Sequence, residues 1–161
     1  NYSLATMRPI TLASEADKGY TFKGATLLND GLKGDGNYRS GRYMGFYSNN
    51  VDATIDLQSE QEISEAFIDT YLVPGDYIFG LTGMEVYVSN DGKSFSKVAS
   101  RQIPVLEKGS KNNVPCHNTL AFDKTKARYV RIVGKCTPTL PAWHSGAGKK
   151  AFLFVDEIGV N

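Results

Sequence analysis

The sequence predicts an all-β fold, an antiparallel β-sandwich. Residues 51–57 and 84–89 alternate apolar and polar side chains, as half-buried strands do. Other short β-prone segments lie between turns rich in Gly, Pro, Asn and Asp, with hardly any helical periodicity. The chain has 161 residues, of which 41% are hydrophobic, which suits one globular domain over residues 1–161. We expect this domain to be a processed chain or a module excised from a longer protein.

Two segments of the first half suit a strand or a short helix. Residues 13–16 suit a single helical turn capped by Ser14. Residues 62–73 have apolar positions compatible with a short helix, but 70–73 are β-prone and Pro74-Gly75 ends the segment. We therefore predict a strand over 62–73.

The second half predicts hairpins and a closing strand. Asn90-Asp91-Gly92 follows the strand at 84–89 and forms a turn that leads to Phe95. Residues 120–122 and 129–133 flank a polar stretch at 123–127, which predicts a second hairpin. Residues 152–160 form the closing strand.

The second hairpin has a consequence for the two cysteines. If it turns around 124–126, Leu120 lies opposite Ile132 and Cys116 lies opposite Cys136, within reach of a disulfide. An oxidising periplasm or cell surface permits that bond. The alternative is two buried free thiols, since a register slip of one residue separates the pair.

Charge and motifs exclude several classes of function. The formal net charge is +1, which predicts no binding to nucleic acid. No apolar run reaches the ~20 residues of a membrane helix, so we expect no membrane insertion. With His117 and His144 as the only histidines and no Gly-x-Ser-x-Gly motif, the parts of a hydrolase are missing. We predict a protein that is not an enzyme.

The glycine-rich segment 25–48 is the least regular part of the chain. It places Asp30 and Asp35 among three glycines in ten residues. Calcium takes oxygen ligands from carboxylates and from carbonyls exposed by tight turns. An ordinary Asn-Asp-Gly turn explains the same residues, and the spacing alone favours the turn.

Seven short motifs follow one another along the chain. They are Leu-Asn-Asp-Gly at 28–31, Gly-Arg-Tyr-Met-Gly-Phe at 41–46, Ile-Asp-Leu at 55–57, Val-Ser-Asn-Asp-Gly-Lys-Ser-Phe at 88–95, Ala-Arg-Tyr-Val-Arg-Ile at 127–132, Trp-His-Ser-Gly-Ala-Gly at 143–148 and Val-Asp-Glu-Ile at 155–158. This ordered set resembles a discoidin domain, the coagulation factor five/eight type C family, in its family 32 carbohydrate-binding branch. The likeness extends to the C-terminal module of Bacteroides chitobiases and β-hexosaminidases of glycoside hydrolase family 20.

The resemblance implies an eight-stranded jelly roll with one structural calcium. It implies ligands from the first loop and from the last strand, a pairing that stabilises the folded state. Position 35 often carries Ser or Thr in relatives, so Asp35 is a departure that adds charge. The implied ligands are the carbonyls of Leu27, Leu32 and Asp156 and the side chains of Asp30, Asp35 and Glu157.

A sugar site needs an aromatic face for the pyranose C–H groups and a few fixed polar groups. We expect Phe46 and Phe79 to be core residues, because loops need apolar anchors. Relatives often carry Trp at position 43, so Tyr43 is a packing residue or a ligand contact. The candidate carbohydrate-binding residues are Trp143, His144, Tyr77, Tyr43, Tyr47, Arg39 and Arg42.

The resemblance leaves the sugar open. Galactose-binding relatives use a His where this chain has Met44, and an Arg and an Asn where residues 71–77 contain neither. N-acetylglucosamine-type and galactose-type glycans are both possible partners. The implied function is a secreted, periplasmic or cell-surface module that binds glycan for a parent catalytic domain. The alternative is a structural module that packs on that domain. A lipid-binding or adhesive role would require protruding apolar loops surrounded by basic residues, and the formal net charge of +1 gives this role no support.

Overall fold

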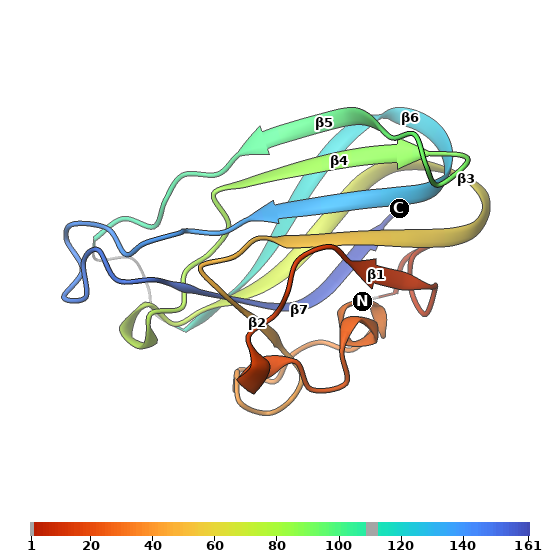
Figure 1. Ribbon diagram of the computed structural model, residues 1–161. Helices are drawn as coiled ribbons and strands as arrows, with labels where there is room; N and C mark the ends of the chain where they lie inside the picture. Colours follow the sequence, from red (N-terminus) through yellow and green to blue (C-terminus); the bar gives the residue numbers. More distant parts are fainter. Residues whose placement is uncertain (1, 109–112) are drawn as a thin grey trace.

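A computed structural model describes residues 2–108 and 113–161 (Figure 1). Within these residues, seven strands alternate with loops and three short 3₁₀ helices. The elements in chain order are β1 (Ile10–Leu12), η1 (Lys18–Tyr20), η2 (Ala25–Asn29), β2 (Met44–Tyr47), β3 (Val51–Leu72), η3 (Pro74–Asp76), β4 (Gly83–Ser89), β5 (Ser96–Gln102), β6 (Val114–Lys135) and β7 (Phe152–Val160).

Two 22-residue strands, β3 and β6, bend at one end of the molecule and take part in both layers of a sandwich (Figure 1). In one layer, residues 51–56 of β3 pair with β1 and with β6, followed by β4 and β5. In the other layer, the second half of β3 lies between β6 and β7, and β7 pairs with β2.

Every pairing between these strands is antiparallel. Apart from the three-residue β1, each layer contains four strand segments when the halves of β3 and β6 are counted separately. The predicted antiparallel sandwich with eight strands in a jelly-roll arrangement is therefore confirmed. The strand predictions for residues 51–57, 62–73, 84–89 and 152–160 are confirmed, and β4 and β5 form the predicted hairpin around 90–92.

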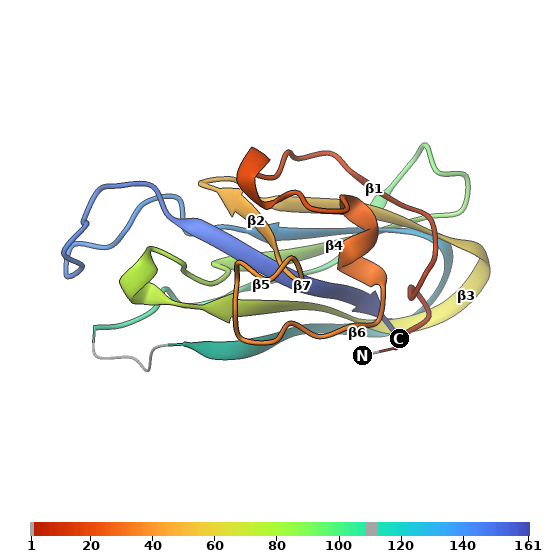
Figure 2. The same cartoon turned by 90° about the horizontal axis from the view of Figure 1, so that it is seen from below.

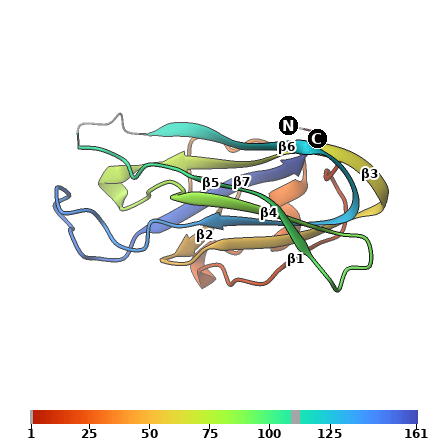
Figure 3. The ribbon, with the colours of Figure 1, turned by 90° about the horizontal axis from the view of Figure 1, so that it is seen from above.

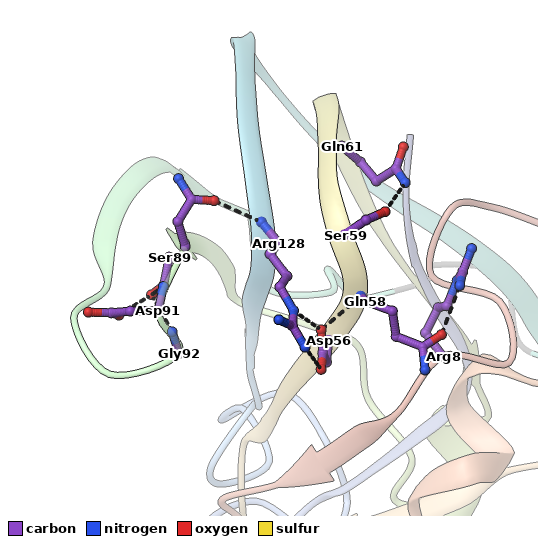
Figure 4. A network of polar contacts seen from close by, with 10 residues as sticks. Arg8, Asp56, Gln58, Ser59, Gln61, Ser89, Asp91, Gly92 and Arg128 are labelled. Atoms are coloured by element: carbon purple, nitrogen blue, oxygen red, sulfur yellow. Dashed lines mark hydrogen bonds and ion pairs between the residues drawn. The ribbon is translucent and has the colours of Figure 1, made fainter.

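A polar network lies where β3 and β6 bend (Figure 4). The Asp56 carboxylate accepts hydrogen bonds from Arg128 Nε at 2.9 Å and Nη2 at 3.0 Å, and from the Gln58 N–H at 2.8 Å. The Arg128 guanidinium holds the pKa of Asp56 below its usual value. The ladder between the two strands is interrupted between Asp56 and Gln61, which marks a bulge at the bend.

The core lies between the layers, and along residues 51–57 of β3 buried residues alternate with partly exposed ones. Val51, Ala53, Ile55 and Leu57 are all fully buried. Phe46 and Phe79 are also buried, at 0% and 1% exposure, as expected for core residues. Burial on this scale is the main favourable term that holds the two layers together.

The outer face of β7 is covered by the long segment between β1 and β2. The Phe154 ring points away from the core and packs edge-to-face against Tyr20 at 4.8 Å and Tyr38 at 5.0 Å. Figure 2 shows η2 lying across the same strand. Consequently β7 is buried on both faces, and acids on its outer face lose contact with water.

Two sequence predictions are wrong. Residues 13–16 form a bend without a helical turn, and the Ser14 hydroxyl instead accepts a hydrogen bond from the Asp52 N–H. The predicted hairpin around 124–126 does not form, because residues 114–135 are one continuous strand that pairs along its length with β3.

The register of β6 separates the two cysteines. Cys116 lies opposite Thr70, and Cys136 follows the far end of the strand. Both thiols are free; Cys136 is buried and Cys116 is partly exposed. The proposed disulfide is therefore absent, and the free-thiol interpretation describes this structure.

Candidate functional site

A bulge in β7 turns two neighbouring acids to the same face of the sheet. Thr70 pairs with Val155 and Asp69 pairs with Glu157, so Asp156 and Glu157 together oppose one residue of β3. An extra residue of this kind shifts the alternation of side chains by one position. Both carboxylates therefore meet the loop that follows η2.

Glu157 is the most buried acid of the described chain, with 0% exposure. Its Oε2 atom accepts a hydrogen bond from the Gly31 N–H at 3.1 Å. Its Oε1 atom is buried and has no hydrogen-bond partner among the described residues. Burial, together with the negative charge of Asp30, raises the pKa of Glu157 to about 9. In the absence of a cation, the protonated form of this side chain is favoured at neutral pH.

The loop after η2 supplies a second carboxylate. Gly31 and Gly36 both have a φ of 79°, a left-handed conformation that suits glycine, and they turn the chain on either side of this loop. Asp30 Oδ1 accepts a hydrogen bond from the Leu32 N–H at 2.9 Å. Asp30 Oδ2 forms an ion pair with Lys23 Nζ at 2.6 Å. Leu27, another residue of the implied ligand set, is buried in η2.

Asp35 lies apart from this pair. It is exposed, and hydrogen bonds from the Ser40 side chain and from the Asn37 N–H lower the pKa of its carboxyl. In residues 2–108 and 113–161, no group of three His, Cys, Asp or Glu side chains is placed to hold a metal ion. The structure thus brings Asp30 and Glu157 together and leaves Asp35 in a separate turn.

The chemistry of these residues fits a hard cation. Calcium takes most of its ligands as oxygens from carboxylates and backbone carbonyls. Glu157 has one buried oxygen without a partner, and Asp30 already attracts the ammonium group of Lys23. The calcium ligand set implied by the sequence remains a prediction, with Asp30 and Glu157 as the side chains that the structure supports.

Asp156 fastens the same loop through its side chain. Its Oδ2 atom accepts a hydrogen bond from the Gly34 N–H at 2.8 Å. Burial, followed by the nearby Asp69 carboxylate, raises the pKa of Asp156 to about 6. The sequence had suggested only a backbone role for this residue.

Three candidate sugar-binding residues meet on loops at the end opposite the bend. The loop over residues 136–151 and η3 lie at this end in Figures 1 and 3. The Tyr77 ring packs edge-to-face on His144, with centroids 5.2 Å apart, and Trp143 lies 5.8 Å from His144. Tyr77 ends η3 in a left-handed backbone conformation, with a φ of 67°. The structure therefore brings Tyr77, Trp143 and His144 together.

His144 joins the two loops through both ring nitrogens. Nδ1 accepts a hydrogen bond from the Gly146 N–H at 2.8 Å, so Nε2 carries the proton and donates to the Pro74 carbonyl at 2.7 Å. Because both nitrogens are used inside the protein, His144 offers a ligand its ring surface. Trp143 is half-buried and packs against Phe79 at a centroid distance of 6.0 Å.

A third loop approaches this end through residues that the sequence reasoning left out of the site. The Tyr38 hydroxyl donates a hydrogen bond to Asp76 Oδ2 at 3.0 Å, which ties the glycine-rich loop to η3. The guanidinium of Arg39, a predicted site residue, lies 5.0 Å from the centre of the Tyr38 ring. The sequence feature that could have identified Tyr38 as a residue near the site is its position beside an arginine on a glycine-rich loop.

The remaining candidates differ in exposure. Tyr43 is 2% exposed, its hydroxyl accepts a hydrogen bond from the Gly36 N–H at 2.9 Å, and its ring packs against Tyr71, so it is a packing residue. Tyr47 is 45% exposed, stacks on Phe152 at 4.6 Å and lies 5.7 Å from Lys150 Nζ.

Arg42 is exposed, and its charge acts on Asp35. Of the three candidates from the first loop, Arg39 is the one connected to η3, and this connection runs through Tyr38. Tyr47 offers a separate exposed ring on the edge strand β2.

The layers and their connections define the class of jelly-roll β-sandwich domains. The sequence model of the F5/8 type C domain matches residues 10–152, which is most of the chain. The chain belongs to the F5/8 type C family. No curated protein matches it. Among the described residues, no helix has the length and apolar character required to cross a membrane.

Solved structures share this fold at low sequence identity. CpGH89CBM32-5 from Clostridium perfringens, in complex with GalNAc-β-1,3-galactose, is 21% identical over 94% of this chain and 93% of its own, with a TM-score of 0.56. A fucose-binding module of Streptococcus pneumoniae is 19% identical over 100% of this chain and 98% of its own, with a TM-score of 0.60. A chitosan-binding module from Paenibacillus is 16% identical over 100% of this chain and 99% of its own, with a TM-score of 0.59.

Proposed function

We propose that this chain is a non-catalytic carbohydrate-binding module with its glycan site on the loops around Tyr77, Trp143 and His144. The supporting observation is that these three rings meet on two loops fixed to a rigid sandwich. Aromatic rings held in this way stack on the C–H face of a pyranose. Its hydroxyls would be oriented by polar groups such as Asp76, which precedes Tyr77, and Arg39, which lies beside the Tyr38 ring that hydrogen-bonds Asp76.

The ligands of proteins with this fold support the same class of partner. The three solved modules named above bind GalNAc-β-1,3-galactose, fucose or chitosan according to their descriptions. We propose a glycan of N-acetylglucosamine or galactose type for this chain. A shallow site of this kind buries little ligand surface, so the affinity is expected to be modest.

The proposal extends to a setting outside the cell. The sequence resembles the C-terminal module of Bacteroides chitobiases and β-hexosaminidases, so the module would keep a parent glycosidase near its glycan. Such a module is secreted, periplasmic or at the cell surface. Its contribution to catalysis is to raise the local substrate concentration for the attached enzyme.

A structural calcium completes the proposal. Asp30 and Glu157 supply the carboxylates, and the carbonyls of Leu27, Leu32 and Asp156 complete the set. Because Asp35 lies in a separate exposed turn, we propose that it contributes little. A bound calcium neutralises the carboxylates and stabilises the connection between the first loop and β7.

A glycan array tests the binding function. The wild type is compared with Trp143→Ala, and Phe22→Ala is the matched control because it removes another exposed ring, 46% accessible, from a different loop. We expect glycan signals that the Trp143 variant loses and the Phe22 variant keeps.

One observation favours the structural alternative, a module that packs on the catalytic domain without a glycan site. His144 uses both ring nitrogens internally, and Trp143 is half-buried. No signal above background across a broad array would support this alternative and reject the binding function.

A further inference from the structure

A tight turn before η2 places Lys23 beside the loop of the proposed calcium site. The Gly24 N–H closes this turn by donating a hydrogen bond to the Thr21 carbonyl at 2.8 Å. Phe22 has a left-handed backbone with a φ of 45°, a conformation that costs free energy in a residue with a side chain. Lys23 lies just before η2 and Asp30 just after it, so the two charged residues flank the same short helix.

The ammonium group of Lys23 compensates one of the two carboxylates of the proposed calcium site. Its Nζ atom lies 2.6 Å from Asp30 Oδ2. The other oxygen of Asp30 accepts the hydrogen bond from the Leu32 N–H at 2.9 Å. The Asp30 side chain is 12% exposed and the Lys23 side chain is 51% exposed. The contact therefore joins a shielded carboxylate to a lysine that water still reaches, and pairs with such exposure contribute little net free energy.

Lys33 provides a comparison on the loop that follows η2. It is exposed, and its charge acts on Asp156. Within residues 2–108 and 113–161, the ion pairs include Lys23 with Asp30 and none with Lys33. The fold thus brings one particular lysine to Asp30, and this lysine comes from the opposite end of η2.

An ammonium group and a calcium ion need the same carboxylate. Calcium takes oxygen ligands, with carboxylates prominent among them. Glu157 Oε1 is buried without a hydrogen-bond partner among the described residues, and Glu157 Oε2 accepts from the Gly31 N–H, directly after Asp30. A calcium ion held by Asp30 would meet the positive charge of Lys23, and two cations at one carboxylate repel each other. Calcium binding and the contact between Lys23 and Asp30 therefore oppose each other.

We propose that Lys23 competes with calcium for Asp30: its ammonium group pairs with this carboxylate when calcium is scarce and leaves it when calcium binds. This inference rests on the calcium site proposed above and adds a means of setting its affinity. Molecules in which Lys23 contacts Asp30 are not competent to bind calcium, so their fraction lowers the apparent calcium affinity of the protein.

Titration calorimetry with calcium chloride tests this competition in the wild type, Lys23→Met, Lys33→Met and Lys23→Arg. We expect Lys23→Met to bind calcium about threefold more tightly or better, because the competing pair is removed. Lys33→Met removes an equal charge from the loop without removing an ion pair, so its gain should be smaller. Lys23→Arg keeps a cationic donor and should remain close to the wild type.

The outcomes separate this inference from the calcium site itself. Calcium binding by the wild type, with a gain in Lys23→Met no larger than that in Lys33→Met, would overturn the competition and leave the calcium site in place. Absence of calcium binding by the wild type and by Lys23→Met would overturn both. Binding by Lys23→Met alone would show that Lys23 prevents calcium binding and would support the inference.

Amine modification of the wild type gives a measurement without substitutions. Acetic anhydride at limiting concentration acetylates exposed lysines, and peptide mass spectrometry reports its extent at Lys23 and at Lys18, an exposed lysine of η1. Saturating calcium should free the Lys23 amine and raise its acetylation about twofold or more over the chelated protein, since a pair of this exposure limits the free amine only in part. Lys18 should not change. Acetylation of Lys23 that calcium leaves unchanged or reduces would overturn the proposal.

Discussion

The backbone N–H of Gly31 donates a hydrogen bond to Oε2 of Glu157, across 126 residues of sequence. It connects the first loop to the bulge of β7, and Asp156 makes a parallel contact with Gly34. Two consecutive acids thus hold one glycine-rich loop. The bulge turns both carboxylates toward this loop, where Glu157 faces the proposed calcium and Asp156 holds Gly34.

Calcium removal should destabilise the protein. At a calcium concentration 100 times the dissociation constant, binding contributes about 2.7 kcal/mol to the free energy of unfolding. Differential scanning calorimetry with and without a chelator should show a lower Tm for the chelated wild type. Glu157→Ala should remove this difference and Asp35→Asn should keep most of it. A chelator that leaves the wild-type Tm unchanged would contradict the calcium site.

The stability of the calcium-free protein should fall as pH rises. The pKa of Glu157 is raised from 4.5 to about 9, so the folded state binds more protons than the unfolded state between these values. The free energy of unfolding then decreases with pH, by ~3 kcal/mol between pH 4.5 and 7.

Urea unfolding of the chelated protein across this pH range checks the effect, with Glu157→Gln as the reference. The glutamine variant retains the shape of the protonated side chain and should lose the part of the decrease that Glu157 causes. A smaller decrease below about pH 6 should remain, because the pKa of Asp156 is raised to about 6. Parallel pH profiles for the two proteins would exclude Glu157 as its source.

Gly134 in β6 should tolerate no side chain. A Cβ atom there would lie 2.8 Å from Val51 Cγ1 and 2.9 Å from Ile68 Cδ1, inside the core. Gly134→Ala should cost about 1–3 kcal/mol of the free energy of unfolding through overpacking. Gly75→Ala is the control, because a Cβ there meets nothing within 4 Å. Equal denaturation midpoints for the two variants would mean that the layers are packed more loosely than described.

Both cysteines should titrate as free thiols. Cys116 lies near the start of β6 and Cys136 directly follows its end, and burial raises the pKa of both thiols. A thiol reagent should therefore react slowly with the folded protein and label two thiols per chain after denaturation without reductant. Fewer than two would show that a disulfide forms and that the register of β6 differs.

The sequence predicted the sandwich well because most strands keep one buried face. Alternation at 51–57 and 84–89 and the turn at 90–92 correspond directly to β3, β4 and β5. The polar stretch 123–127 was misinterpreted as a turn. It lies in the bent part of β6, where only Ala127 is buried, so its composition resembles that of a loop.

The site was partly predictable. The motifs named Glu157 and the Trp143 loop as candidates, but they did not predict the bulge that turns Asp156 and Glu157 to one face. Its signal is a shift in the core-facing apolar positions, from Leu153 and Val155 to Ile158 and Val160. The contacts of Asp69 and His117 with this region depend on strand pairing, which residue spacing along one strand cannot supply.

The fluorescence of Trp143 tests the central claim most directly, since this is the only tryptophan of the chain. A glycan identified on the array is titrated into the wild-type protein, and its dissociation constant is measured in parallel by calorimetry. The account predicts a saturable change in emission with the same dissociation constant. A glycan that binds by calorimetry and leaves the emission unchanged would contradict a site around Tyr77, Trp143 and His144.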